Sequence, residues 1–274
     1  MKKYSYIYLV GPITIILAIC LFIPLIAVLV PTFFEEGGMS LGRYLSFFSD
    51  TYYLNIFVRT IRVSLICTLV CMILGIPTAY FISRTSTKVR GVLMAIAIFP
   101  MLTNSVIRAF AWINVLGKNG IINQILGIFN IEPVSMLYTE FSVLIGTIYL
   151  FLPLMIITLV GVMENIDNDM MEAAESLGAN RIVAFFKVIL PMSVPGIITG
   201  GVLVFTGALT AYTTPQLLGG PSNMLMSTLI YQRAMTLNDW TSASVIALIM
   251  IVTTLIVMKG LNYVASKLDK RGLE

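Results

Sequence analysis

Long apolar runs alternate with short, charge-bearing connections along the whole chain. A helix that crosses the hydrocarbon core of a membrane needs about 20 apolar residues. Each long stretch without Asp, Glu, Lys or Arg can hold one such crossing, and these stretches cover residues 4–34, 63–83, 91–107, 141–163, 188–232 and 240–258. The pattern therefore predicts an all-α polytopic membrane protein with six transmembrane helices.

The run at 188–232 is long enough for two crossings, but its second half contains TTPQLLGGPSNM. Proline and glycine interrupt helices, so Pro215, Gly219, Gly220 and Pro221 predict a poorly helical segment there. One crossing is therefore assigned to this run. The predicted helices cover about residues 8–30, 56–82, 91–112, 141–163, 191–212 and 241–263.

The connections predict one further element and no internal boundary. The segment 117–140 has the pattern of a short amphipathic helix on the outer surface. No repeat of fixed period, low-complexity tract or linker divides the chain. Residues 1–274 are therefore predicted to form a single transmembrane domain.

Basic residues are distributed unevenly between the two sides of a six-helix arrangement. Lys and Arg accumulate in the short cytoplasmic loops of membrane proteins. Eleven of the 17 basic residues fall on one side, which predicts that both termini and the connection around Glu172 are cytoplasmic. These eleven are Lys2, Lys3, Arg84, Lys88, Arg90, Arg181, Lys187, Lys259, Lys267, Lys270 and Arg271.

Composition supports the membrane assignment. The chain is 58 % hydrophobic and 11 % charged, and its mean hydropathy is +0.95. The apolar run after MKKYSY is longer than the roughly 7–15 residues of a signal-peptide core, and no small-x-small cleavage site follows it. The run is therefore predicted to be retained as the first helix.

The residue types exclude most catalytic chemistry. The chain has no histidine, which removes His-based acid–base catalysis, Ser-His and Cys-His nucleophile pairs, and the commonest zinc sites. It has no G-x-x-x-x-G-K-[ST] phosphate loop, and no predicted helix carries paired carboxylates near its middle. Cys67 and Cys71 lie one helical turn apart in an apolar run, which favours packing over a disulfide or a metal site. The sequence therefore predicts no enzyme, no metal site and no cofactor.

One polar, helix-forming segment, EAAESLGANRIVAFFKVILP at 172–191, interrupts the apolar pattern. Asp169 is placed to cap a helix from Met170, with Glu172 at the capping-box spacing. Gly178 stands where a short helix would end in a left-handed residue, and Asn180 is a possible cap for a second helix that leads to Pro191. A bare alanine face permits close approach of another surface. The two interpretations are a docking surface for another protein and an interfacial helix that only anchors the loop.

The spacing in this segment resembles the EAA loop of membrane subunits of ABC importers, E-A-A-x3-G-x9-I-x-L-P. Only the isoleucine differs, being Val188 here. The resemblance implies a type I importer permease fold. It also implies that the loop, about 164–191, forms a coupling helix that docks into an ATP-binding subunit. The matching residues are Glu172, Ala173, Ala174, Gly178, Leu190 and Pro191.

Four further stretches, TNSVIRAFAW, GKNGIINQIL, YLFLPLM and TPQLLGG, are similar to the first permease subunit of spermidine/putrescine importers. That resemblance implies a polyamine substrate, a second homologous permease, an ATPase dimer, an extracytoplasmic binding protein and location in the bacterial cytoplasmic membrane. Members of this group often carry an acid before T-P-x-L-L-G-G, where this chain has ALTAY. An amino-acid-like or organophosphorus substrate therefore stays open, as does a stand-alone secondary carrier, which would need internal symmetry and mid-membrane ionisable groups.

Several polar residues near the outer helix ends are candidates for the solute path. The broken stretch at 212–224 needs protein or water around it in a membrane, or it forms a surface turn that touches the binding protein. Arginines at helix ends usually reach to the interface, as expected for Arg59 and Arg62; Arg108 does the same or turns inward. Glu140 and Asp239 either attract a cation or only solubilise helix ends. The path candidates are Asn104, Arg108, Tyr149, Tyr212, Thr214 and Gln216.

Overall fold

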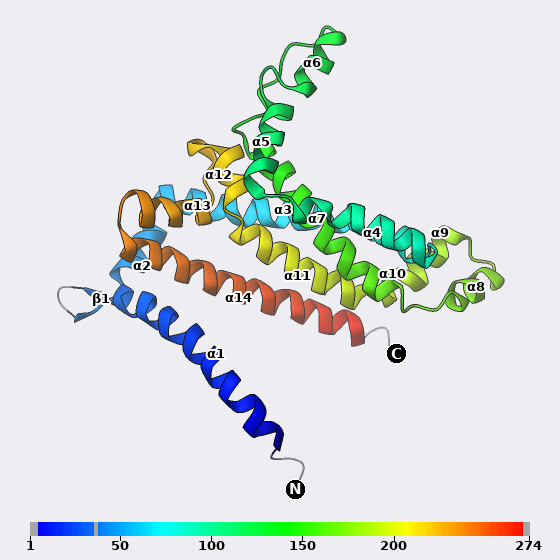
Figure 1. Ribbon diagram of the computed structural model, residues 1–274, viewed down its shortest axis with the longest axis horizontal. Helices are drawn as coiled ribbons and strands as arrows, with labels where there is room; N and C mark the ends of the chain where they lie inside the picture. Colours follow the sequence, from blue (N-terminus) through cyan, green and yellow to red (C-terminus); the bar gives the residue numbers. More distant parts are fainter. Residues whose placement is uncertain (1–4, 36–37, 271–274) are drawn as a thin grey trace. The chain divides into compact units, whose positions relative to one another are not determined.

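A computed structural model of the chain describes residues 5–35 and 38–270, and nearly all of them are helical (Figure 1). Within these residues one short ladder occurs, in which β1 (Phe34–Glu35) pairs antiparallel with β2 (Gly38–Met39). The predicted all-α class is thus confirmed apart from this hairpin. Lys2, Lys3 and Arg271, which contribute to the predicted orientation, lie outside the described residues.

Fourteen α-helices follow one another along the described chain. They are α1 (Ser5–Leu29), α2 (Gly42–Ser49), α3 (Thr51–Ser83), α4 (Thr87–Leu102), α5 (Ser105–Leu116), α6 (Ile121–Ile128), α7 (Glu140–Met163), α8 (Asp169–Ser176), α9 (Arg181–Ala184), α10 (Leu190–Met192), α11 (Val194–Thr210), α12 (Thr213–Gly219), α13 (Met226–Tyr231) and α14 (Trp240–Lys270). Short 3-10 turns cover Val30–Phe33 and Pro221–Asn223, and π-helical turns cover Phe185–Ile189 and Gln232–Thr236.

The described residues contain four helices that are each long and apolar enough to cross a membrane, or up to six crossings if each of two bent helix pairs is one span. The predicted count of six is confirmed when each bent pair is counted as one span. The predicted continuous helix at 91–112 is wrong, because Thr87–Leu102 and Ser105–Ile128 meet at 93°. The helix predicted from 191 begins at Val194 instead, after a bend of 67°.

Local chemistry accounts for both bends. At the first, the Asn104 side chain accepts hydrogen bonds from the backbone N–H groups of Val106 and Ile107 at 2.9 and 3.3 Å, so it starts a new helix instead of continuing the old one. At the second, Pro195 has no N–H to donate to the carbonyl of Pro191, so the helical ladder is interrupted there. Neither signal is visible in an apolar run judged by length alone.

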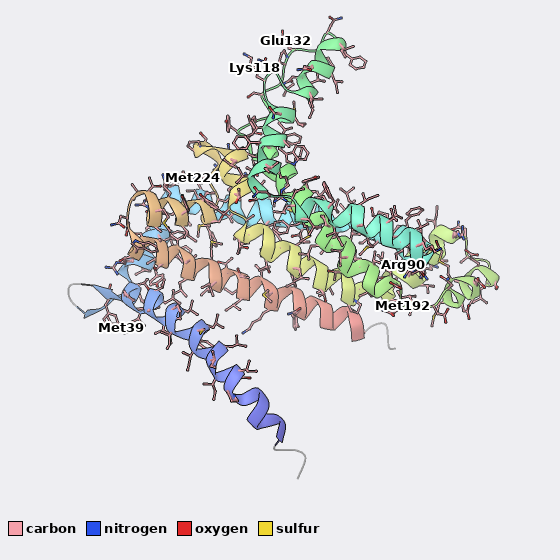
Figure 2. All side chains as sticks on the ribbon, viewed as in Figure 1. Met39, Arg90, Lys118, Glu132, Met192 and Met224 are labelled. Atoms are coloured by element: carbon pink, nitrogen blue, oxygen red, sulfur yellow. The ribbon has the colours of Figure 1, made fainter. Side chains whose placement is uncertain are left out.

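Two segments outside the long helices also differ in detail from expectation. The stretch at 213–219, predicted to be poorly helical, forms α12, because Pro215 falls in the first helical turn, where its missing N–H costs nothing. Gly220, at φ +64°, ends that region. The short helix predicted in 117–140 is confirmed as α6. Figure 2 shows Lys118 and Glu132 at the end of the α5–α6 segment that is remote from Arg90.

The chain divides into two compact units. Unit 1 comprises the residues up to Leu54 together with Leu229–Val252. In it, Arg43 Nη1 donates to the carbonyl oxygens of Pro31 and Phe34 at 3.2 and 3.1 Å, so α2 is held against the turn that follows α1. The described apolar side chains of α1 are largely exposed, as expected of a helix that faces lipid.

Unit 2 comprises Asn55–Thr228 and the segment after Val252, and α7 is its central helix. Helices α4, α5, α11 and α12 pack against α7 (Figure 1). The core joins side chains of α3, α7 and α11, including the buried thiols Cys67 and Cys71, which are free. Their predicted packing role is confirmed.

Small residues let the core helices of unit 2 approach closely. A Cβ on Gly75 of α3 would lie 2.6 Å from Met155 Cγ, and one on Gly200 of α11 would lie 2.7 Å from Met155 Sδ. Met155, fully buried on α7, therefore fills a gap that only glycines on both neighbours leave open. Close approach at small residues is a common way for membrane helices to gain van der Waals contact.

Candidate coupling segment and solute path

Helix α8 has two faces with different surroundings. Met171 and Ala174 point inward, toward a cluster that includes Ile166, Ala184 and Ile189. On the other face, Met170 is 49 % exposed and Leu177 is 91 % exposed, and the intervening Ala173 is also exposed. The two alanines of the motif thus have different surroundings. Ala174 packs against the cluster, and Ala173 is exposed on the outer face, where its small side chain leaves the surface apolar and flat.

The start of α8 differs from the prediction. Asn168, not Asp169, precedes the helix, and its backbone is helical at φ −63° and ψ −31° with no side-chain cap. A capping side chain requires an extended backbone at that position, so the predicted cap by Asp169 is wrong. Glu172 lies in the first turn and is exposed, where a negative charge favours the helix dipole.

The end of α8 and the start of α9 agree with the prediction. Gly178 has φ +91°, in the left-handed region. Asn180 caps α9 by accepting from Val183 N–H at 2.8 Å. Leu190 and Pro191 belong to the separate helix α10, beyond the π-helical turn, so the structure does not place them on the same helix as Glu172 and the two alanines. The predicted stiff connection into the next long helix is interrupted by the 67° bend.

Arg108 closes the break between α4 and α5. Its side chain is 8 % exposed, and Nη1 donates to the carbonyl oxygens of Pro100 and Thr103 at 2.5 and 3.4 Å. These carbonyls lie at the end of α4, where backbone donors run out, and Pro100 O also accepts from the Thr103 hydroxyl at 2.8 Å. The prediction that Arg108 reaches to the interface is therefore wrong, and the inward alternative is correct. Asn104 caps the same break from the other side.

Three helices bring the other path candidates into one region of unit 2. Helix α12 packs against both α5 and α7. The Tyr149 ring on α7 meets the Trp112 ring on α5 edge to face, with centroids 5.6 Å apart. Thr214 is buried against Gly146, whereas Gln216 is exposed and Tyr212 is half-buried. Of the α12 candidates, Gln216 and Tyr212 can meet a solute and Thr214 packs.

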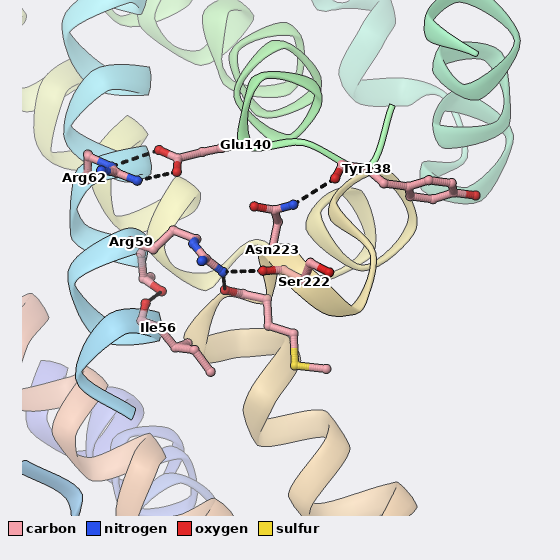
Figure 3. A network of polar contacts seen from close by, with 9 residues as sticks. Ile56, Arg59, Arg62, Tyr138, Glu140, Ser222 and Asn223 are labelled. Atoms are coloured by element: carbon pink, nitrogen blue, oxygen red, sulfur yellow. Dashed lines mark hydrogen bonds and ion pairs between the residues drawn. The ribbon is translucent and has the colours of Figure 1, made fainter. Parts of the chain in front are cut away.

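Arg59 and Arg62 bind other parts of unit 2, and their reach to the membrane interface stays a prediction. Arg59 Nη1 donates to Ser222 O at 2.8 Å, and Met224 O lies at 3.5 Å. Arg62 forms a two-pronged ion pair with the Glu140 carboxylate, with Nε at 2.9 Å from Oε1 (Figure 3). The two arginines join α3 to the turn after α12 and to the start of α7.

The turn after α12 is also joined to α7 directly. Asn223 Nδ2 donates to Tyr138 O at 2.8 Å (Figure 3), and Ser142 Oγ donates to Leu218 O at 2.8 Å. Leu225 is fully buried beside α3 and α7. The 218–225 segment is thus anchored on two long helices.

Glu140 and Asp239 are both engaged by arginine. Asp239 lies beside Arg233 at 3.9 Å and accepts the backbone N–H of Ser242 at 3.0 Å. Hydrogen bonds from the Ser242 side chain and backbone, together with the Arg233 charge, lower the pKa of the Asp239 carboxyl from its usual value. These contacts favour a structural role over the attraction of a cationic solute.

The Arg62–Glu140 pair is expected to contribute modestly to stability. Arg62 is 56 % and Glu140 25 % exposed at the side chain, and exposed ion pairs contribute less than about 1 kcal/mol. We expect Arg62→Glu to lower the melting temperature of the purified protein slightly, because it places two carboxylates together. Adding Glu140→Arg should restore it, and a double variant no more stable than either single variant would contradict the pairing.

Comparison with known proteins identifies the family. Residues 71–270 match the family described as binding-protein-dependent transport system inner membrane components. The spermidine/putrescine transport system permease protein PotB of Haemophilus influenzae is 33 % identical over 263 residues, covering 92 % of this chain and 91 % of that protein. PotB of Escherichia coli K12 is 34 % identical over 194 residues, 70 % of each chain.

The solved structures agree on the fold. A chain of a bacterial alginate ABC transporter in complex with alginate pentasaccharide-bound periplasmic protein superposes with a TM-score of 0.81, at 19 % identity and with 98 % of each chain covered. This likeness confirms the predicted ABC importer permease fold and says nothing of the solute. The extent of the family match and the shared architecture lead to one conclusion: the chain belongs to the family of binding-protein-dependent transport system inner membrane components.

Proposed function

We propose that this permease forms half of the translocation pore of an ABC importer for polyamines such as spermidine and putrescine. Its partners are a second homologous permease, a dimer of ATP-binding subunits and an extracytoplasmic binding protein. The observation that carries the proposal is the 33 % identity to a spermidine/putrescine permease over 92 % of this chain. In this arrangement residues 1–274 act as one permease domain with both termini in the cytoplasm.

The outer face of α8 is the proposed docking surface for the ATP-binding subunit. Met170, Ala173 and Leu177 recur at helical spacing, so they form one apolar stripe. An apolar stripe that ends in a leucine 91 % exposed, on a helix proposed to face the cytoplasm, is the kind of surface that a protein partner covers. Gly178 then turns the chain away from the docked partner, and Leu190 and Pro191 belong to the helical route toward α11.

The proposed solute path runs past α5, α7 and α12. Tyr149 with its Trp112 neighbour supplies aromatic faces, which attract ammonium groups. Tyr212 and Gln216 add polar atoms from α12, while Asn104, Arg108 and Thr214 hold the helices in place. Recognition of the amine then rests on aromatic rings and on the binding protein, since this stretch of α12 carries no acid.

Uptake measurements test the substrate. Cells with the complete set of importer genes should accumulate labelled spermidine or putrescine, and cells lacking this permease should not. The purified binding protein should bind the same amine. Equal uptake by both strains, with a binding protein that ignores polyamines but binds an amino-acid-like or organophosphorus compound, would replace the polyamine by that solute.

Copurification tests the docking surface. Leu177→Asp should remove most of the ATP-binding subunit from the purified permease, because a buried carboxylate would be left without a partner. Leu45→Asp is the matched control, since Leu45 on α2 is also exposed, at 68 %. Full retention of the ATP-binding subunit by Leu177→Asp would show that this face of α8 does not dock it.

A further inference from the structure

We infer that Tyr80 and Arg84 are positioning residues that tie the coupling helix α8 to the C-terminal end of α3, so that movement of α8 reaches α3 directly. This inference rests on the proposed docking of α8 to an ATP-binding subunit. It adds a route that the chain order does not suggest, because α8 is followed along the sequence by α9, α10 and α11. We call the contacts of Tyr80 and Arg84 with residues 166–171 the α3–α8 tie.

Tyr80 makes the first contact of the tie. Its hydroxyl group donates to Met171 Sδ at 3.1 Å, across 91 positions of sequence. Its ring meets the Phe185 ring edge to face, with centroids 4.9 Å apart. Tyr80 also borders the buried cluster that contains Met171. One side chain of α3 therefore touches both α8 and the π-helical turn that follows α9.

Arg84 makes the second contact of the tie. Its Nη1 donates to Ile166 O at 2.9 Å and to Asn168 Oδ1 at 2.5 Å, so it holds the residues immediately before α8. The guanidinium carbon lies 5.6 Å from the Tyr80 ring centre, within cation–π range. Its Nε and Nη2 are buried and have no hydrogen-bond partner among the described residues. Burial of a charge is costly unless it is paired, so the two hydrogen bonds of Nη1 and the Tyr80 ring are the contacts that offset this cost.

An ion pair from the first turn of α4 holds the turn between α3 and α4 and the end of α7 together. Arg90 forms a salt bridge with Glu164, at the end of α7, and its Nη2 donates to Thr85 O at 3.2 Å. The turn between α3 and α4 is thereby joined to the end of α7, just before the segment that Arg84 holds. Arg84 and Arg90 act at two successive points of the 164–168 connection.

The surroundings leave few other contacts that could carry the movement. A cavity of about 720 Å³ lies between the end of α3 and α8–α9, lined among others by Pro77, Phe81, Glu172 and Phe186. Tyr80, Arg84, Asn168 and Met171 line the same cavity, so the contacts of the tie form part of its wall. The route along the chain is interrupted by a π-helical turn and by the 67° bend before α11. Besides the covalent 164–168 connection to α7, the tie is thus a direct contact of α8 with a second long helix of the unit 2 core, α3.

The experiment reads how well the permease passes the signal of the binding protein to the ATP-binding subunits. The complete importer is reconstituted in proteoliposomes, and ATP hydrolysis is measured with and without the binding protein purified with its own ligand. We expect Arg84→Gln to lower the stimulation by the binding protein about fivefold or more, with basal hydrolysis and copurification of the ATP-binding subunit unchanged. Arg84→Lys, which keeps one charged donor, should fall between Arg84→Gln and the unaltered protein.

A smaller change keeps the test decisive if Arg84→Gln fails to insert. Tyr80→Phe removes only the hydroxyl contact with Met171 Sδ and should also lower the stimulation, whereas Thr78→Ala, two residues earlier on the exposed face of α3, should not. Unchanged stimulation in Arg84→Gln, or in Tyr80→Phe where Arg84→Gln does not insert, overturns the inference. If the unaltered permease does not copurify with the ATP-binding subunit, the proposed function is overturned instead.

Discussion

Replacing Gly178 with valine is expected to reduce solute uptake by about tenfold or more while the protein stays in the membrane. Gly178 has φ +91°, and a left-handed backbone costs an L-residue about 1–2 kcal/mol, more for a β-branched one. A conformational cost of about 1.4 kcal/mol lowers the population of the native corner about tenfold. The strain is relieved only by turning α9 relative to α8, which misplaces the docking surface. Uptake by cells and the amount of permease in isolated membranes measure the two effects.

Gly178→Asn is the matched control for this prediction. Asparagine adopts left-handed conformations more readily than other non-glycine residues, and no atom lies within 4 Å of a Cβ at this position. The asparagine variant should therefore keep most of the uptake. If valine and asparagine behave alike, the effect comes from side-chain size and not from backbone conformation; if valine changes nothing, the corner has no part in coupling.

Replacing Arg108 with alanine is expected to destabilise the permease by about 1.5–3 kcal/mol, the range for a hydrogen bond to a charged group. The change leaves Thr103 O without the Arg108 donor and Pro100 O with the Thr103 hydroxyl alone, at the break between two helices. It also removes the packing of a residue that is only 8 % exposed. Thermal melting of the purified protein, with and without its partners, measures the loss.

Arg108→Lys separates the hydrogen bonds from the packing of the side chain. Lysine keeps the charge and one donor group but cannot reach two carbonyl groups with a planar fork. Its stability should lie between that of the alanine variant and that of the unaltered protein. Equal melting temperatures for alanine and arginine at this position would contradict the assignment of Arg108 to the helix break.

The coupling segment shows how much of a site local sequence can predict. The glycine corner at Gly178 and the cap at Asn180 follow from backbone preferences of single residues, and both are confirmed. The cap at Asp169 was wrong because Asp169 is already the first residue of α8, and its own N–H donates to Asp167 Oδ1 at 3.3 Å. Which alanine faces inward also depended on α3, since the cluster that covers Ala174 is completed by Tyr80.

The arginines show the limit of the same reasoning. As single residues at helix ends, Arg59, Arg62 and Arg108 fit the general tendency to reach to the interface. In the structure Arg59 binds a carbonyl group 163 positions away and Arg62 a carboxylate 78 positions away. The sequence near either arginine does not predict these partners. Arg84 and Arg90, which form the α3–α8 tie and its neighbouring ion pair, were visible only as charges that set topology.

By itself the sequence determined the class of the protein, the approximate position of its apolar spans and the glycine corner at Gly178 between two short helices, because these depend on hydropathy, length and fixed spacing along the chain. Tertiary structure alone decided where two of the spans bend, which face of α8 is open and what each arginine binds. The physical reason is range: apolar burial acts on every residue of a run, whereas a hydrogen bond or an ion pair needs a particular partner whose position only the packed helices define.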